Sequence, residues 1–238
     1  MHQPRPFFAY VKAKRHSMAA MSLSFMLALA PALYAAPPTY NIVALNVLPG
    51  GLDSIGFGLN DSGEIVGEST LNRSGNVGQS RPVVWDYNGT PSELFSSQLI
   101  GASLQGINNT GKIVGRYGSG SFIPLPGSGV PYGRAFYWSA GTGMLGFGFD
   151  GNSEAVAINS SGQVAGTAER QEVLDFGNGP QPINIPHAFI WDVTNGIHAI
   201  GDLPGSNGDS FANGIDNHGQ VALPKKSDLH TILCDSNT

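Results

Sequence analysis

Six residues of this chain have the spacing of a nucleotide-binding loop. Gly146-Phe147-Gly148-Phe149-Asp150-Gly151 matches the fingerprint G-x-G-x-x-G, whose glycines let the backbone approach a pyrophosphate at the start of a helix. The segment that follows, Ser153–Ile158, alternates in a period of two and predicts a strand instead of a helix. We therefore expect no nucleotide site here and no cofactor.

Two pairs of carboxylates could in principle cleave a glycosidic bond, which requires a separation of about 5 to 9 Å. The pairs are Glu169 with Glu172 and Asp202 with Asp209. Nothing in the sequence places either pair in one cleft. A carbohydrate-active enzyme on a β-propeller scaffold is the alternative function.

Other catalytic and metal sites have weaker support. Nucleophilic catalysis needs a base beside the nucleophile, and no G-x-S-x-G elbow occurs. The histidines beyond residue 36 are His187, His198, His218 and His230. They include no His-x-x-x-His pair for zinc, and the one cysteine, Cys234, lies near the end of the chain. The sequence predicts no catalytic residue and no metal site.

Oxygen-bearing side chains gather where turns are expected, as at Asp61, Asp150 with Asn152, and Asp216 with Asn217. Calcium prefers six to eight oxygen ligands, so such turns could hold it. No stretch fits the EF-hand or the nonapeptide calcium repeat. Turn formation is the favoured interpretation, and calcium binding stays an open alternative.

A turn motif recurs along the chain and indicates the architecture that must position these residues. The pattern Ile/Leu-Asn/Asp-x-x-Gly-x-Ile/Val-x-Gly occurs at Leu59–Gly67, Ile107–Gly115, Ile158–Gly166 and, in a degenerate form, Ile215–Ala222. Its Asn/Asp positions, 60, 108, 159 and 216, are 48, 51 and 57 residues apart. Such a period is typical of propeller blades or solenoids.

All three tryptophans share a second motif, in which a basic residue or His stands four positions earlier. The three copies are Arg81 to Trp85, Arg134 to Trp138 and His187 to Trp191. The tryptophans could form a row that stacks on sugars. Their strict recurrence favours equivalent buried positions, because Trp buries a large area.

The two motifs in register resemble the HAF family of extracellular repeats of secreted bacterial proteins. The third copy carries His187-Ala188-Phe189 itself, and the resemblance covers about residues 41 to 222. It implies an exported repeat protein and brings no general biochemical activity. Arg81 and Arg134 replace the His in two copies, so this position is not a strict catalytic or metal-binding requirement.

Composition agrees with many short strands. Of the 238 residues 12% are charged, against about 25% in typical domains, and 33 are Gly. We expect an all-β fold of about 50-residue, four-stranded units, propeller-like and incomplete, with three full units and a truncated fourth. The predicted domains are a signal peptide (1–36), HAF-type β repeats (37–222) and an anomalous tail (223–238).

The units differ in length between the second strand and the Trp strand. We expect loops at Leu71–Ser80, Ser119–Pro131 and Arg170–Pro186, the last two because they are rich in Pro and Gly. Insertions at one point of a repeat lie on one face, often the binding face. These loops are therefore the predicted contact surface for a cell-surface or polysaccharide ligand.

The first 36 residues have the pattern of a secretory signal. Four basic residues precede the apolar run Met18–Pro31, small residues follow it, and no acidic residue occurs before Asp53. A membrane anchor would need roughly 20 apolar residues. Removal of the signal leaves 8 of the 12 basic residues against 17 acidic ones, which makes nucleic acid an unlikely partner.

The last residues depart from the repeat. After Gln220-Val221-Ala222 the chain continues with Leu223-Pro224-Lys225-Lys226 and a polar run without Trp. A truncated reading frame or an unusual cap would explain this, and we expect residues 225–238 to be poorly ordered. An incomplete array exposes a sheet edge, which predicts self-association.

Together these patterns predict a secreted protein with a structural or binding role and no catalysis. The mature chain should begin between residues 33 and 37, because charge and apolar length fit a cleaved signal. Intact mass of the exported protein measures this directly. A full-length product retained in the cytoplasm would contradict it.

Overall fold

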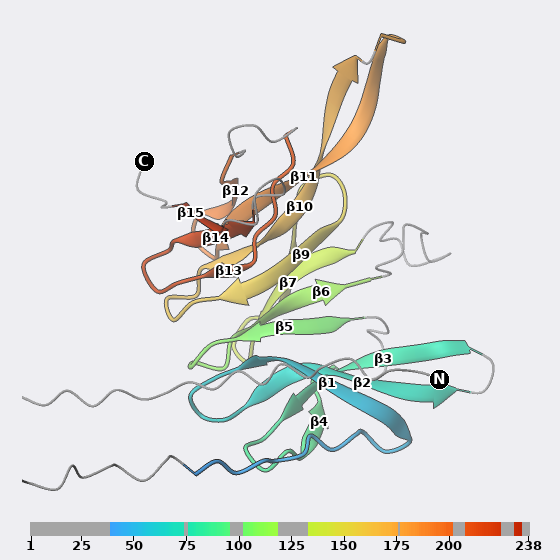
Figure 1. Cartoon of the computed structure of the whole chain (residues 1–238), viewed down its shortest axis with the longest axis vertical. Coiled ribbons are helices and arrows are strands. Elements are labelled where there is room, and N and C mark those ends of the chain that lie inside the picture. The colour runs from blue at the N-terminus through green and yellow to red at the C-terminus, as the bar shows by residue number, and fades with distance from the viewer. Residues whose placement is uncertain are drawn as a thin grey trace, which may run out of the picture. The chain divides into compact units, whose positions relative to one another are not determined.

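All regular structure in the described part of the chain is β-sheet (Figure 1). The computed structural model describes residues 39–73, 76–95, 102–118, 133–175, 177–201, 208–224 and 231–234. The sheets belong to the compact unit Ile42–Thr238. The predicted all-β class is confirmed, whereas the predicted signal peptide lies outside the described residues.

Four antiparallel sheets follow one another along the chain, and in each of them consecutive strands pair. Sheet I consists of β1 (Gly51–Leu59), β2 (Ile65–Arg73), β3 (Asn76–Trp85) and β4 (Pro91–Glu93). Sheet II consists of β5 (Ser103–Ile107), β6 (Ile113–Tyr117), β7 (Arg134–Ser139) and β8 (Gly143–Phe147). Sheet III consists of β9 (Ser153–Ile158), β10 (Val164–Asp175), β11 (Pro180–Asp192) and β12 (Gly196–Ala199). Sheet IV consists of β13 (Gly214–Ile215), β14 (Val221–Pro224) and β15 (Thr231–Cys234).

The three tryptophans occupy the same place in sheets I to III. Each lies on the third strand, opposite the first residue of the second strand: Ile65 faces Trp85, Ile113 faces Trp138, and Val164 faces Trp191. The predicted shared register is confirmed. Trp85 and Trp191 are buried, whereas Trp138 is only half-buried.

The recurring Asn forms the turn between the first and second strands, as predicted. Asn108 Oδ1 accepts hydrogen bonds from the backbone N–H of Thr110 (3.0 Å) and of Lys112 (3.1 Å). Gly111 completes the turn with a φ of 71°, a value at which a side chain would be strained. Asn60 makes the corresponding two bonds in sheet I.

The side-chain nitrogen of each recurring Asn joins its sheet to the next one. Asn60 Nδ2 donates to the carbonyl oxygen of Asn108 at 3.3 Å, Asn108 Nδ2 to Asn159 at 3.0 Å, and Asn159 Nδ2 to Asp216 at 2.9 Å. The three asparagines are buried. We call this series the asparagine ladder. It ends at Asp216, whose carboxylate has no N–H to donate.

Apolar contacts between successive sheets complete the core. Val66 of sheet I packs with Leu104 and Phe136 of sheet II. Phe147, at the end of β8, stacks on Trp191 of sheet III with ring centroids 4.5 Å apart. Ala165 of sheet III shares a cluster with residues of sheet IV. The core therefore consists of layers between sheets.

Two predicted loops are wrong. Leu71–Ser80 and Arg170–Pro186 are extensions of the β2–β3 and β10–β11 hairpins, paired as far as Arg73 with Asn76 and Asp175 with Pro180. The prolines of β11 stand at positions 180, 182 and 186, so the three missing N–H groups fall on one side of the strand. A proline-rich strand is therefore possible at this edge. The third predicted loop, Ser119–Pro131, lies outside the described residues.

The structure describes four residues of the predicted tail beyond Pro224. Thr231–Cys234 form β15, which pairs with β14 from Pro224–Thr231 to Val221–Cys234. Sheet IV therefore extends beyond its second strand, although no Trp marks the third. The expectation for residues 225–230 and 235–238 falls outside the described residues.

The ladder should contribute measurably to stability. Asn108→Asp keeps the oxygen that accepts the turn bonds but removes the amide donor and leaves the Asn159 carbonyl without this partner. The free energy of unfolding should fall by about 1 to 3 kcal/mol. Chemical denaturation measures this, with Asn88→Asp in the exposed β3–β4 turn as the control. Equal midpoints for both variants would show that the ladder adds nothing.

Replacement of each tryptophan by alanine should reduce stability in proportion to the burial of its side chain. Trp85→Ala and Trp191→Ala should each reduce the free energy of unfolding by about 3 to 5 kcal/mol, because both side chains are buried. Trp138→Ala should reduce it less, because that side chain is half-buried. Denaturation of the three variants checks the order.

Candidate functional site

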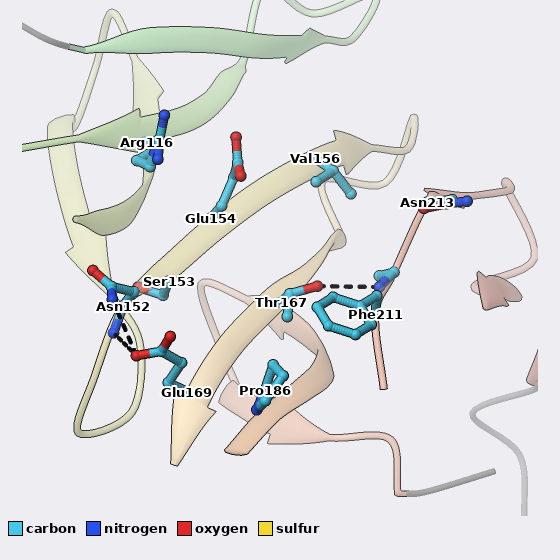
Figure 2. Close-up of a pocket in the computed structure, with 11 residues that line it drawn as sticks. Arg116, Asn152, Ser153, Glu154, Val156, Thr167, Glu169, Pro186, Phe211 and Asn213 are labelled. Carbon is cyan, nitrogen blue, oxygen red and sulfur yellow. Dashed lines mark hydrogen bonds between the residues drawn. The ribbon is translucent and has the colours of Figure 1, made fainter. Parts of the chain in front are cut away.

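A pocket of about 370 Å³ is lined by residues of sheets II and III and of the segment before β13 (Figure 2). Sheet II contributes one residue, from β6. Sheet III contributes β9, β10 and β11, and the segment before β13 closes the remaining wall. The lining residues are Arg116, Asn152, Ser153, Glu154, Val156, Thr167, Glu169, Pro186, Phe211, Ala212 and Asn213.

Two carboxylates line this pocket from adjacent strands. Glu154 of β9 pairs with Thr167 of β10, and Glu169 lies two residues further along β10 on the same face. Glu154 and Glu169 are therefore diagonal neighbours, a relation that places Cα atoms about 7 to 8 Å apart. The register of sheet III thus brings together two carboxylates that are 15 positions apart in the chain.

The two carboxylates have different surroundings. Glu169 Oε2 accepts hydrogen bonds from the backbone N–H of Asn152 at 3.0 Å and from its side-chain amide at 3.1 Å. Glu169 also exchanges backbone bonds with Asn152 and Gly151. Glu154 is half-buried and makes no side-chain hydrogen bond within the described residues. Glu169 therefore holds the loop before β9, whereas Glu154 is available to a ligand.

Arg116 supplies the positive charge of the pocket. It lies near the end of β6, and its Nε is buried without a hydrogen-bond partner in the described part of the chain. Figure 2 shows Arg116 and Glu154 on neighbouring strands along the same side of the opening. Arg81 Nε, outside the pocket, is in the same condition, so it is the position of Arg116 in the lining that makes its guanidinium a candidate donor to a ligand.

The opposite wall is apolar. Phe211 is 42% exposed and lies beside Thr167, whose Oγ1 accepts a hydrogen bond from the backbone N–H of Ala212 at 3.2 Å. An exposed ring beside carboxylate, guanidinium, hydroxyl and amide groups suits a ligand with both C–H faces and hydroxyls. Across the residues that the structure describes, no three His, Cys, Asp or Glu side chains gather as metal ligands.

Of the two carboxylate pairs considered in the sequence, the one that the structure describes in full does not converge. Glu169 and Glu172 are three positions apart on β10 and point to opposite faces of the sheet. Glu172 Oε1 lies 3.0 Å from His187 Nε2. Asp202 falls outside the described residues, so its pairing with Asp209 stays a prediction. Glu154 was missed, because only the β9–β10 register shows that it lies near Glu169.

The basic residue or His that stands four positions before each Trp makes a polar contact within the fold. Arg81 Nη1 contacts Glu93 Oε1 at 2.6 Å, and Arg134 Nη1 donates to the carbonyl oxygen of Phe149 at 2.7 Å. His187 is buried at the same place in sheet III. Three different partners at one repeated position indicate packing and hydrogen bonding instead of a common reaction.

The turn carboxylates hold their own backbone. Asp216 Oδ1 accepts from the N–H of Gln220 at 2.8 Å and of His218 at 2.9 Å, and these bonds lower the pKa of Asp216. The N–H of Thr90, followed by that of Asn88, lowers the pKa of Asp86 in the same way. These contacts agree with the interpretation of the Asx positions as turn formers.

A recurring Ser forms a second link between sheets that the sequence analysis missed. Ser153 Oγ accepts from the N–H of Ala135 at 2.9 Å and donates to the carbonyl oxygen of Phe147 at 2.9 Å. Ser210 does the same with Ala188 (2.9 Å) and Gly201 (3.3 Å). The signal was visible as an Asp or Asn followed by Ser, six residues before the ladder position.

No family model matches this chain, and no curated protein matches it. The resemblance to HAF repeats therefore depends on the two motifs themselves. In the described part of the chain there is no helix long and apolar enough to cross a membrane.

The two carboxylates of the pocket should differ in their effect on stability. Glu169→Ala leaves the N–H and amide of Asn152 unpaired and should reduce the free energy of unfolding by about 1 to 3 kcal/mol. Glu154→Ala should change it by no more than about 0.5 kcal/mol. Guanidinium denaturation compares the two, and equal losses would contradict this division of roles.

Proposed function

We propose that this chain is a secreted, propeller-like β-repeat protein that binds a carbohydrate-type ligand and does not catalyse a reaction. The propeller-like part of the proposal is supported by sheets I to III, which are meanders of four consecutive strands with one Trp register and are joined by the asparagine ladder. The proposed secretion depends on the signal-like residues 1–36.

The observation that carries the binding role is the unrepeated polar lining of one pocket. Glu154 follows Ser153, and the residues that likewise stand five positions before the ladder position in the other units are Ile55, Ser103 and Phe211. None of these three residues is charged, so the fold does not require a charge at this repeated position. Together with Arg116, Glu154 gives this pocket a chemistry that the repeat does not explain.

The ligand class follows from the lining. Carboxylate, amide and hydroxyl oxygens accept hydrogen bonds from sugar hydroxyls, and the guanidinium donates to sugar oxygens. Phe211 offers a ring to a C–H face. The β10–β11 hairpin begins beside the pocket, at the Glu169–Pro186 pair, and could extend contact along a polymer. We therefore propose a polysaccharide or cell-surface glycan as the partner.

A carbohydrate-active enzyme is the second candidate. It is favoured by the presence of Glu154 and Glu169 in one pocket, because glycoside hydrolysis uses a pair of carboxylates. It is disfavoured by the two bonds from Asn152, which already occupy the Glu169 carboxylate. One experiment on Glu154 separates the two functions.

Binding should depend on the pocket charges. Arg116→Ala and Glu154→Gln should each weaken binding of a responsive polysaccharide at least about tenfold, the effect of losing one charge-assisted hydrogen bond. A glycan array followed by calorimetry measures this, with Glu68→Gln on sheet I as the control. Unchanged affinity in both pocket variants would exclude this site.

The chain should release no sugar from the polysaccharide that it binds. Deletion of Ser119–Pro131, predicted to lie on the binding face, should abolish binding while the β circular-dichroism signal persists. Reducing-end release by the wild type that Glu154→Gln eliminates would establish the enzyme instead.

A further inference from the structure

In the described part of the chain sheet IV has three strands, whereas sheets I to III have four each. Its order is β13-β14-β15, and within the described residues β15 has no neighbour on its outer side. An unpaired strand edge presents backbone N–H and C=O groups that another extended segment can use. The missing neighbour would correspond to β4, β8 or β12.

Leu45, at the end of the segment Ile42–Leu45, contacts sheet I in the way that the last residue of a fourth strand contacts the next sheet. Ser54 Oγ donates to the carbonyl oxygen of Leu45 at 2.8 Å. The equivalent Ser153 donates to Phe147, the last residue of β8, at 2.9 Å. Leu45 therefore takes the place that Phe147 takes at the junction of sheets II and III.

Apolar packing supports the same equivalence. Leu45 packs on the cluster of Val83 and Trp85 in sheet I. Phe147 packs on Phe189 and Trp191, which hold the corresponding positions in sheet III. The segment is also anchored by Trp85 Nε1, which donates to the carbonyl oxygen of Asn46 at 2.7 Å.

This segment has no sheet of its own. Residues 42–45 form no strand, and Ile42 is 98% exposed. Sheet I is also uncovered on the face that would adjoin a preceding sheet: Leu59 is 63% exposed, whereas Ile107, its equivalent in sheet II, is 8% exposed. Within the described residues, sheet I thus has an extended segment and an exposed apolar face with no sheet before them, and sheet IV has three strands.

We propose that Ile42–Leu45 of one copy of this chain pairs with β15 of a second copy. The register follows from sheet II, where Ala135 faces Phe147 and Trp138 faces Met144. Cys234 takes the position of Trp138, because it faces Val221 as Trp138 faces Ile113. Ile42 therefore lies opposite Cys234, and Leu45 lies opposite Thr231.

A second copy is favoured over closure within one chain. In the single chain both partners are present and unpaired, and Leu45 and Asn46 are held against sheet I. Two copies that exchange this pairing complete both fourth sheets by two equivalent contacts, which a two-fold axis relates. The eight sheets that result are within the four to eight of closed propellers. The inference rests on the proposed propeller-like arrangement and not on the proposed ligand.

The new junction would lack one bond. Asp216 cannot donate to the carbonyl oxygen of Asn60 as the ladder asparagines do. Main-chain pairing and burial of Leu59 must hold it instead, so the association should depend on concentration.

The register is tested by a disulfide. Ile42→Cys in the full chain should form, under mild oxidation, a species of two chains with no remaining thiol, because directly opposite strand residues have the separation of a disulfide. Non-reducing electrophoresis, thiol titration and light scattering measure this. Val43→Cys is the matched control, since its side chain points to the other face, and the wild type controls for direct Cys234 linkage.

Each outcome decides the proposal. An enriched two-chain species in Ile42→Cys alone supports it. A disulfide within a single chain, a series of larger linked species, or equal linkage in Val43→Cys overturns it. In the otherwise wild-type chain, Leu59→Asp should shift the mass from two chains to one without lowering the unfolding midpoint of the monomer. Ligand binding is measured separately, so a failed pocket does not affect this result.

Discussion

The fold depends on one repeated side chain that satisfies two sets of backbone groups. The oxygen of the ladder asparagine binds N–H groups of its own turn, and its nitrogen binds a carbonyl group of the next sheet. The first set fixes how the first two strands of a sheet pair. The second fixes where the following sheet begins. Because one side-chain amide makes both sets of bonds, the strand register within a sheet and the spacing between sheets are coupled. Contacts between sheets, such as that of Phe147 with Trp191, depend on this spacing.

Local features were predictable from sequence, whereas contacts between units were not. Asn-x-x-Gly predicted the turns, and the alternation in Ser153–Ile158 predicted β9 with its observed ends. The motif could not reveal that Asn108 reaches Asn159, because its partner lies in another copy of the same pattern. The prolines at Arg170–Pro186 predicted a loop, but they are compatible with a strand because their missing N–H groups all lie on the side of β11 that faces away from β10. β15 lacks the Trp that marked the other third strands.

The candidate site shows the same limit. Glu169 was recognised as a carboxylate of interest but was paired with Glu172, its neighbour in sequence. Neighbours three apart on a strand diverge, whereas Glu154, 15 positions away, lies on the same face. Ser153 and Asn152, which organise this region, belong to a recurring pair that a search for catalytic motifs does not examine. Cross-strand register is the information that single-sequence patterns lack.

The alternate prolines of β11 have a consequence for solubility. Beyond its pairing with β12, which spans only Phe189–Asp192, this long strand has an open side. Extended hairpins with open sides are templates on which unfolded or foreign strands deposit and fibrils grow. Three of the N–H groups that such deposition would need are missing at positions 180, 182 and 186. The prolines therefore make the open side of β11 a poorer template for an added strand.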